Sequence, residues 1–224
     1  SSDLLVRRSG SRSIIPRPAD ERGMVLEAHW SSSERPSGGT CFIAFPGVGD
    51  IGLLALELIE GLLPSKTLAE IIDPTLPSLA RLDEDGILRP PHHRLVAVEA
   101  RGGTIHLFIG SGQTSSSVQQ HEVAKDLIAM FQGMEEVVGL AGFRSDALDR
   151  RSFFVATSDE GMRAMKQDGR PMSHTEPRSG CIGVLALLTS LGPRFNLNTS
   201  LAISTTFGGN SKDPFSAQRL TSMR

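Results

Sequence analysis

Three glycines, Gly47, Gly49 and Gly52, stand at the spacing G-x-G-x-x-G directly after the apolar run at residues 41–45. Dinucleotide-binding enzymes use this spacing, because backbone N–H groups at a helix start can bind a diphosphate. Asp73 lies roughly twenty residues further on, where such enzymes place the acid that binds a ribose. The first chemistry that the chain offers is therefore coenzyme binding.

The segment after Asp73 argues against a coenzyme. A dinucleotide-binding unit continues with a second helix, whereas residues 82–88 read LDEDGIL, in which Asp85-Gly86 is a hairpin-turn signal. Asp50 also stands at the helix start, where its charge would repel a phosphate and its side chain suits an N-cap. We therefore interpret the glycines as a tight strand-to-helix turn, and we expect no cofactor.

A second polar loop, residues 110–117 (GSGQTSSS), follows an apolar run and precedes an amphipathic segment. Its hydroxyls and backbone N–H groups suit a phosphate or a carboxylate, and α/β proteins place ligands in loops at the carboxyl ends of parallel strands. The alternative is that the loop only caps the helix that follows. A serine nucleophile would need a G-x-S-x-G elbow, which this loop does not contain.

We predict that the two loops lie side by side at the carboxyl edge of the sheet. A small-molecule or anion-binding enzyme, related to nucleosides or phosphate, would use residues 47–52 and 111–117 as two halves of one site. The candidate ligand-binding residues are Gly47, Gly49, Asp50, Ser111, Gln113 and Thr114.

The titratable side chains form no set with the spacing of a catalytic or metal centre. His92-His93, His121-Glu122, and His174 with Glu176 each lack a third ligand nearby in the sequence. Residues 83–85 are acidic, but at a hairpin tip they favour a soluble turn over a cation site. We predict no catalytic residues and no metal.

The composition argues against several classes of function. The chain has 224 residues and a formal net charge of -2, without the basic stripe of a nucleic-acid-binding protein. No apolar run approaches the roughly 18 residues of a membrane span, and the first residues do not read as a signal peptide. Cys41 and Cys181 stand in separate apolar runs, as buried thiols do in a reducing compartment. We expect a cytoplasmic protein that binds neither nucleic acid nor membrane.

Apolar periodicity divides the chain into alternating strands and helices. Residues 1–22 predict an irregular arm, and residues 23–224 predict one α/β domain. Such alternation is typical of a three-layer α/β/α fold with a mostly parallel central sheet, here with an inserted β-hairpin. The expected strands are 23–30, 41–45, 67–72, 94–99, 104–110, 136–140, 152–156 and 201–205. The expected helices are 50–63, 118–131, 157–167, 180–191 and 213–223.

The expected helix at residues 180–191 is apolar on nearly every side. A helix of this kind must be covered all round. It is either a helix of the core or one that a second subunit partly covers, which would make the protein a homo-oligomer.

The order of the segments resembles the proteasome assembly chaperone family more closely than any single motif does. The similarity extends over roughly residues 40 to 218. The segments that carry it are 45–52 (FPGVGDIG), 83–88 (DEDGIL), 109–115 (IGSGQTS), 140–143 (LAGF), 155–160 (VATSDE), 180–188 (GCIGVLALL) and 213–214 (DP).

This resemblance implies a nucleoside-phosphorylase-like α/β domain that forms homo-oligomers and binds proteasome α-type subunits without catalysis. The family supplies no catalytic residues that could be carried over. Members can present a C-terminal hydrophobic–tyrosine tail to the proteasome ring, whereas this chain ends in LTSMR and contains no tyrosine. In this respect the sequence departs from the tail-docking pattern of the family.

Overall fold

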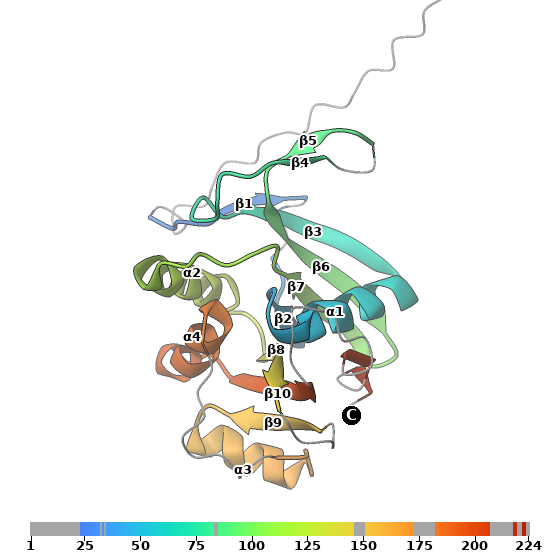
Figure 1. Ribbon diagram of the computed structural model, residues 1–224. Helices are drawn as coiled ribbons and strands as arrows, with labels where there is room; N and C mark the ends of the chain where they lie inside the picture. Colours follow the sequence, from blue (N-terminus) through green and yellow to red (C-terminus); the bar gives the residue numbers. More distant parts are fainter. Residues whose placement is uncertain are drawn as a thin grey trace, which may run out of the picture.

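The computed structural model describes residues 23–31, 33, 35–82, 85–145, 151–172, 182–206, 217–218 and 221–222. Within these residues, eight strands form one sheet in the order β1-β3-β6-β7-β2-β8-β10-β9 (Figure 1). The expected arm at 1–22 and most of the expected helix at 213–223 lie outside the described residues. The division into an arm and a single domain stays a prediction.

Four parallel strands form the centre of the sheet. The order is β7 (Gly103–Ile109), β2 (Thr40–Ala44), β8 (Glu136–Arg144) and β10 (Thr199–Thr206), each parallel to the next. All residues of β10 are buried and none of β2 is exposed, as expected for strands that are covered on both faces. The carboxyl ends of these strands therefore meet at one edge of the sheet.

Antiparallel strands extend the sheet on both sides. β6 (His92–Ala100), β3 (Ser65–Ile72) and β1 (Glu27–Trp30) follow β7, and β9 (Ser152–Ala156) follows β10. The registers place the end of β3, the start of β6 and the end of β7 together. These three points lie at the same edge as the carboxyl ends of the parallel strands.

The predicted α/β class is confirmed, and the sheet is mixed. The expectation of mostly parallel strands is right for the centre and wrong for the flanks. β6 and β7 are joined by two residues, and such a short connection allows only an antiparallel pair. The likeness to nucleoside phosphorylases stays a prediction.

Helices lie on both faces of the sheet and form the outer layers (Figure 1). Helices α2 (Ser117–Met130) and α4 (Val184–Leu191) contribute to one hydrophobic cluster, and α1 (Ile51–Leu62) contributes to the other. Helix α3 (Asp159–Gln167) packs beside β9 and adds Met165 to the cluster of α1. The predicted three layers are therefore present.

The predicted inserted hairpin is confirmed. β4 (Arg81–Leu82) pairs antiparallel with β5 (Leu88–Arg89) and forms a separate two-stranded sheet. Gly86 has φ 75°, the left-handed conformation that an Asp-Gly turn requires. The hairpin stands at the end of the molecule beyond β1 and β3 (Figure 1).

Helices α1 and α4 are buried to different extents. The buried residues of α1 are Ile51, Gly52, Ala55 and Leu56, while Leu62 is 72% exposed. Helix α1 therefore packs only one side on the sheet, and the number of its apolar residues alone does not predict this one-sided burial. Helix α4 packs against α2 and the strands β8 and β10, so the interpretation as a core helix accounts for most of its apolar side chains.

The described residues include no helix long and apolar enough to cross a membrane. Cys41 is buried in the central strand β2, as expected, and burial raises the pKa of its thiol. Cys181 lies outside the described residues.

Candidate functional site

The turn between β2 and α1 is closed by its own hydrogen bonds. Asp50 donates its backbone N–H to the Gly47 carbonyl oxygen at 3.1 Å, and Asp50 Oδ1 accepts from the Gly47 N–H at 3.2 Å. Gly49 has φ 64° within the short 3-10 helix Val48–Asp50, a conformation that suits glycine. The Asp50 carboxylate thus occupies an N–H group that a bound anion would use.

Close backbone packing explains two of the glycines around this turn. A Cβ on Gly52 would collide with the Leu140 carbonyl of β8, and a Cβ on Gly142 would collide with the Val48 carbonyl. The turn and the first residues of α1 therefore rest directly on the backbone of β8. This packing is the physical reason for Gly52, and it agrees with the interpretation of the motif as a tight turn.

We call the edge of the sheet at the carboxyl ends of the parallel strands, with the loops 46–50 and 110–117, the loop edge. Gln113 joins three segments there. Its Nε2 donates to the Pro46 carbonyl at 3.0 Å, and its Oε1 accepts from the Val184 N–H at the start of α4 at 2.9 Å. The glycine loop and the 111–117 loop therefore lie side by side, as the sequence predicts. Both ends of the Gln113 amide are engaged within the protein.

The remaining polar groups of the second loop cap α2. Thr114 Oγ1 donates to Gln119 Oε1 at 2.8 Å, and Gln120 Nε2 donates to the Thr114 carbonyl at 2.6 Å. Ser116 is the N-cap, and its Oγ accepts from the Gln119 N–H at 3.5 Å. The capping interpretation of the loop accounts for these contacts. Ligand binding by the six candidate residues stays a prediction.

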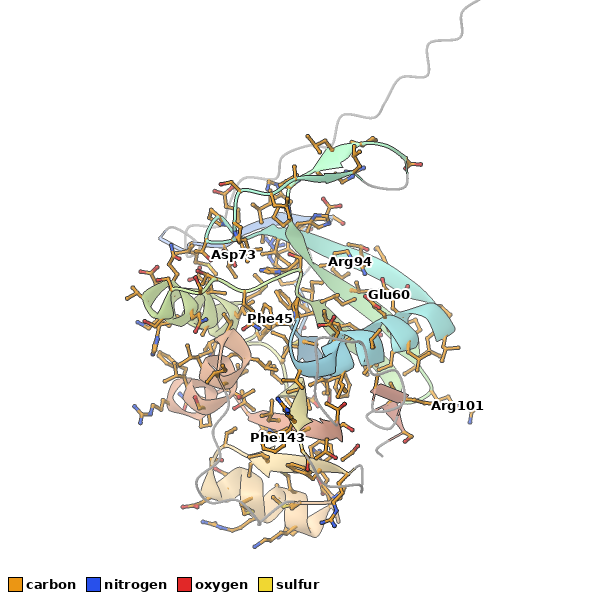
Figure 2. All side chains as sticks on the ribbon, viewed as in Figure 1. Phe45, Glu60, Asp73, Arg94, Arg101 and Phe143 are labelled. Atoms are coloured by element: carbon orange, nitrogen blue, oxygen red, sulfur yellow. The ribbon has the colours of Figure 1, made fainter. Side chains whose placement is uncertain are left out.

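A buried arrangement of Asp73, His93 and Ser111 lies at the same edge, and sequence reasoning did not find it. The His93 ring is fully buried; its Nδ1 accepts from the Ser111 N–H at 3.0 Å. Its Nε2 lies 3.5 Å from Asp73 Oδ2 and has no hydrogen-bond partner among the described residues. Asp73, in the turn after β3, and Phe45, directly after β2, both contact the ring and are labelled in Figure 2.

Electrostatics keep the Asp73 carboxylate ionised. Burial alone would raise the pKa of Asp73, but the neighbouring His93 ring and two hydrogen bonds from Thr75 outweigh burial and lower the pKa below its ordinary value. The two Thr75 bonds, from its N–H at 2.8 Å and its hydroxyl at 2.6 Å, both reach Oδ1. Oδ2 is the oxygen that faces His93.

These three residues are of the types that form a nucleophilic triad, but they are not arranged as one. Ser111 Oγ lies 3.5 Å from His93 Nδ1, while the N–H of the same residue occupies that nitrogen at 3.0 Å. A general base needs its acceptor nitrogen aimed at the hydroxyl proton. The arrangement instead fastens the loop after β7 to the start of the strand β6.

The other sequence candidates have local partners. His92 Nδ1 lies 3.1 Å from the Pro90 carbonyl, and His121 Nδ1 lies 3.0 Å from the Ser117 carbonyl. No group of three or more His, Cys, Asp or Glu side chains within the described part of the chain could hold a metal ion. His174, Glu176 and the acids at 83–84 lie outside the described residues.

A groove of about 480 Å³ runs between the start of α2, α4 and the strands β9 and β10. None of the six candidate ligand residues lines it. Its lining residue Ile182 is 96% exposed, and Val118, which follows the lining residue Ser117, is 67% exposed. The lining residues are Ser117, Gln120, His121, Val155, Ala156, Thr157, Ile182, Gly183, Ala186, Leu187, Thr189, Ser190 and Leu201.

The fold is that of a mixed α/β protein, and the polar side chains Asp50, Gln113 and Thr114 of its loop edge form hydrogen bonds within the protein. The chain belongs to the PAC2 family, whose model matches residues 41–223. This match confirms the resemblance to proteasome assembly chaperones. No curated protein matches the chain at a significant level.

Solved structures with the same fold include two proteins of Pyrococcus furiosus. The chain superposes on PbaB, an archaeal proteasome activator, with TM-score 0.78 at 18% identity over 88% of this chain and 86% of PbaB. It superposes on PbaA, an archaeal homologue of proteasome-assembly chaperone, with TM-score 0.69 at 18% identity over 88% and 78% of the two chains. A proteasome-assembly chaperone homologue of Mycobacterium tuberculosis gives TM-score 0.64 at 16% identity over 82% of each chain.

Proposed function

We propose that this protein is a protein-interaction module that binds proteasome α-type subunits, and that it acts by binding and not by catalysis. The observation that carries this proposal is the match of the PAC2 family over residues 41–223. Two structures that share its fold are described as an archaeal proteasome activator and as an archaeal homologue of proteasome-assembly chaperone. The proposal extends to a cytoplasmic homo-oligomer.

The surface of the β4–β5 hairpin supports an interaction role. Leu79, Leu82 and Leu88 are 51%, 70% and 64% exposed. None of them belongs to either hydrophobic cluster of the described core. A short two-stranded hairpin gains stability when a further surface covers it, and exposed large apolar side chains gathered in one place mark interaction sites. We place the contact with the α-type subunit here.

Purified α-type subunits of the source organism provide the test. We expect the protein to co-elute with them in size-exclusion chromatography and to accelerate their assembly into rings, followed by native mass spectrometry. An activator would instead raise peptide hydrolysis by the mature proteasome, which a parallel peptidase assay measures. Failure to bind both the free subunits and the mature particle would refute the proposal.

A further inference from the structure

We propose that His93 is a proton-controlled latch: its neutral ring holds the loop at residues 110–114 closed, and protonation of the ring releases that loop. The latch concerns the protein by itself and is independent of any partner. It follows from the position of the ring, from the donor that it accepts, and from the segments that the loop connects.

The ring of His93 is packed so closely that it cannot turn or move to solvent if its charge changes. Its side chain is fully buried at the start of β6. Phe45 meets it edge-on, with ring centroids 5.6 Å apart at 84°, and Phe108 of β7 lies at 5.3 Å and 45°. A new charge on this ring must be met by a rearrangement of the groups that face its two nitrogens.

The closed loop requires one form of the ring. Nδ1 accepts the Ser111 N–H at 3.0 Å, so Nδ1 carries no proton and the neutral ring bears its proton on Nε2. That N–H faces Asp73 Oδ2 at 3.5 Å. In the protonated ring, Nδ1–H would point at the Ser111 N–H, and two donors cannot pair.

Ser111 itself offers the second position of the latch. Its Oγ lies 3.5 Å from Nδ1 and can accept a hydrogen bond from a protonated Nδ1, which the backbone N–H cannot do. Protonation therefore exchanges a bond from the Ser111 N–H to the ring for a bond from the ring to the Ser111 hydroxyl. The exchange requires the Ser111 backbone to move away from β6.

One acid, Asp73, faces the ring, and two further acids lie on the helix that packs on the same face of the sheet. Asp73 lies beside the ring after β3, while Asp126 and Glu122 are on α2. Burial raises the pKa of Asp126 against hydrogen bonds from Leu26 and Val25, and the charges of Glu122 and Asp73 raise it further. Phe45, directly after β2, and Phe108 of β7 present uncharged rings to His93.

Release of Ser111 would reach two further segments through Gln113. The Gln113 amide lies two residues along the loop and bonds the Pro46 carbonyl and the Val184 N–H. Movement of the loop therefore loosens the glycine turn and the start of α4 together. The fold thus couples one buried ring to three segments at the loop edge.

Histidine-resolved NMR with amide hydrogen exchange tests the latch between about pH 8 and about pH 5, the range in which histidine changes charge. At the upper end we expect the Nε2–H tautomer of His93 and a protected Ser111 amide. The Ser111 protection factor, corrected for the intrinsic pH dependence of exchange, should fall at least about tenfold as His93 becomes protonated. Amides in β2 should not follow this change.

Three variants make the test specific. His93→Asn places an amide oxygen near the position of Nδ1 and cannot take up a proton in this range, so Ser111 protection should no longer depend on pH. Ser111→Ala removes the hydroxyl acceptor and should move the release to lower pH. Asp126→Asn removes the half-buried acid on α2 and should leave the release in place.

The latch is refuted if wild-type His93 shows the Nδ1–H tautomer at the upper pH or stays neutral throughout the range. It is also refuted if Ser111 protection does not change while His93 titrates, or if His93→Asn shows the same fall as the wild type. If His93→Asn does not fold, the wild-type tautomer and the wild-type exchange profile decide the question by themselves.

Discussion

The loop edge and the β4–β5 hairpin are built in opposite ways. At the loop edge, Asp50, Gln113 and Thr114 direct their polar atoms to partners within the chain. At the hairpin, Leu82 and Leu88 expose most of their apolar surface. Polar groups bonded internally fix a shape, whereas exposed apolar groups gain free energy from a second surface.

This difference suggests a division of labour. The loop edge, where ligands of α/β proteins usually bind, is fastened by its own side chains and positions the strands that lead to the hairpin. The hairpin contributes little to the core and is available to a partner. Substitutions at the two regions should therefore separate the stability of the fold from its binding.

The largest effect is expected where the loop edge rests on β8. Gly52→Ala forces a Cβ into the Leu140 carbonyl, and we expect a loss of at least about 3 kcal/mol in the free energy of unfolding. Gly61, in the same helix, has open space around its Cβ position. Gly61→Ala should instead stabilise the helix by up to about 1 kcal/mol.

Urea unfolding of the two alanine variants, followed by circular dichroism, measures both free energies. If Gly52→Ala unfolds at the same urea concentration as the wild type, the inference that α1 packs directly on the backbone of β8 is wrong. The matched change in Gly61 controls for the general preference of a helix for alanine.

The sequence was sufficient to predict the glycine turn, the hairpin and the side-by-side position of the two loops. These depend on local signals: a breaker after an apolar run, Asp85-Gly86 in a turn, and polar residues after a strand. Loops that follow parallel strands meet at one edge whatever the order of the strands in the sheet. Predicting that the two loops meet therefore did not require the order of the strands.

Predicting the contact between Asp73, His93 and Ser111 would have required the order of the strands in the sheet. The three residues lie 18 or more positions apart and meet because β3, β6 and β7 are consecutive antiparallel neighbours. One signal was present in the sequence: His93 shares the alternation of Leu95, a core residue of β6. A histidine in the buried phase of a strand needs a partner, but the alternation does not say which one.

A smaller effect is expected from Gln113, which tests whether the loop edge is fastened by side chains. Gln113→Ala leaves the Pro46 carbonyl and the Val184 N–H without this partner, and we expect a loss of about 1–3 kcal/mol. Gln113→Glu keeps an acceptor for Val184 but has no donor for Pro46, so its loss should be intermediate.

Gln132→Ala provides the control for Gln113. The side chain of Gln132 donates to the Phe195 carbonyl at 3.1 Å at an exposed position, where water can replace it. We expect its loss to stay within about 0.5 kcal/mol. Thermal unfolding of the three variants ranks them, and an equal effect of Gln113→Ala and Gln132→Ala would contradict the special role of Gln113.

The smallest effect on stability, and the sharpest test of the comparison, is expected at the hairpin. Because Leu82 and Leu88 are 70% and 64% exposed and lie outside the hydrophobic clusters, the double variant Leu82→Ser/Leu88→Ser should unfold within about 0.5 kcal/mol of the wild type. Its affinity for the α-type subunit should fall at least about tenfold, because apolar side chains at the centre of an interface dominate binding.

Val118→Ser is the matched control for this double variant. Val118 is 67% exposed but lies on α2, next to the groove and outside the hairpin. We expect this change to leave both stability and binding as in the wild type, measured by urea unfolding and by isothermal titration calorimetry. If the hairpin variant binds the α-type subunit as tightly as Val118→Ser does, the partner contacts another surface. Replacing exposed leucines leaves the affinity unchanged only where the partner does not cover them.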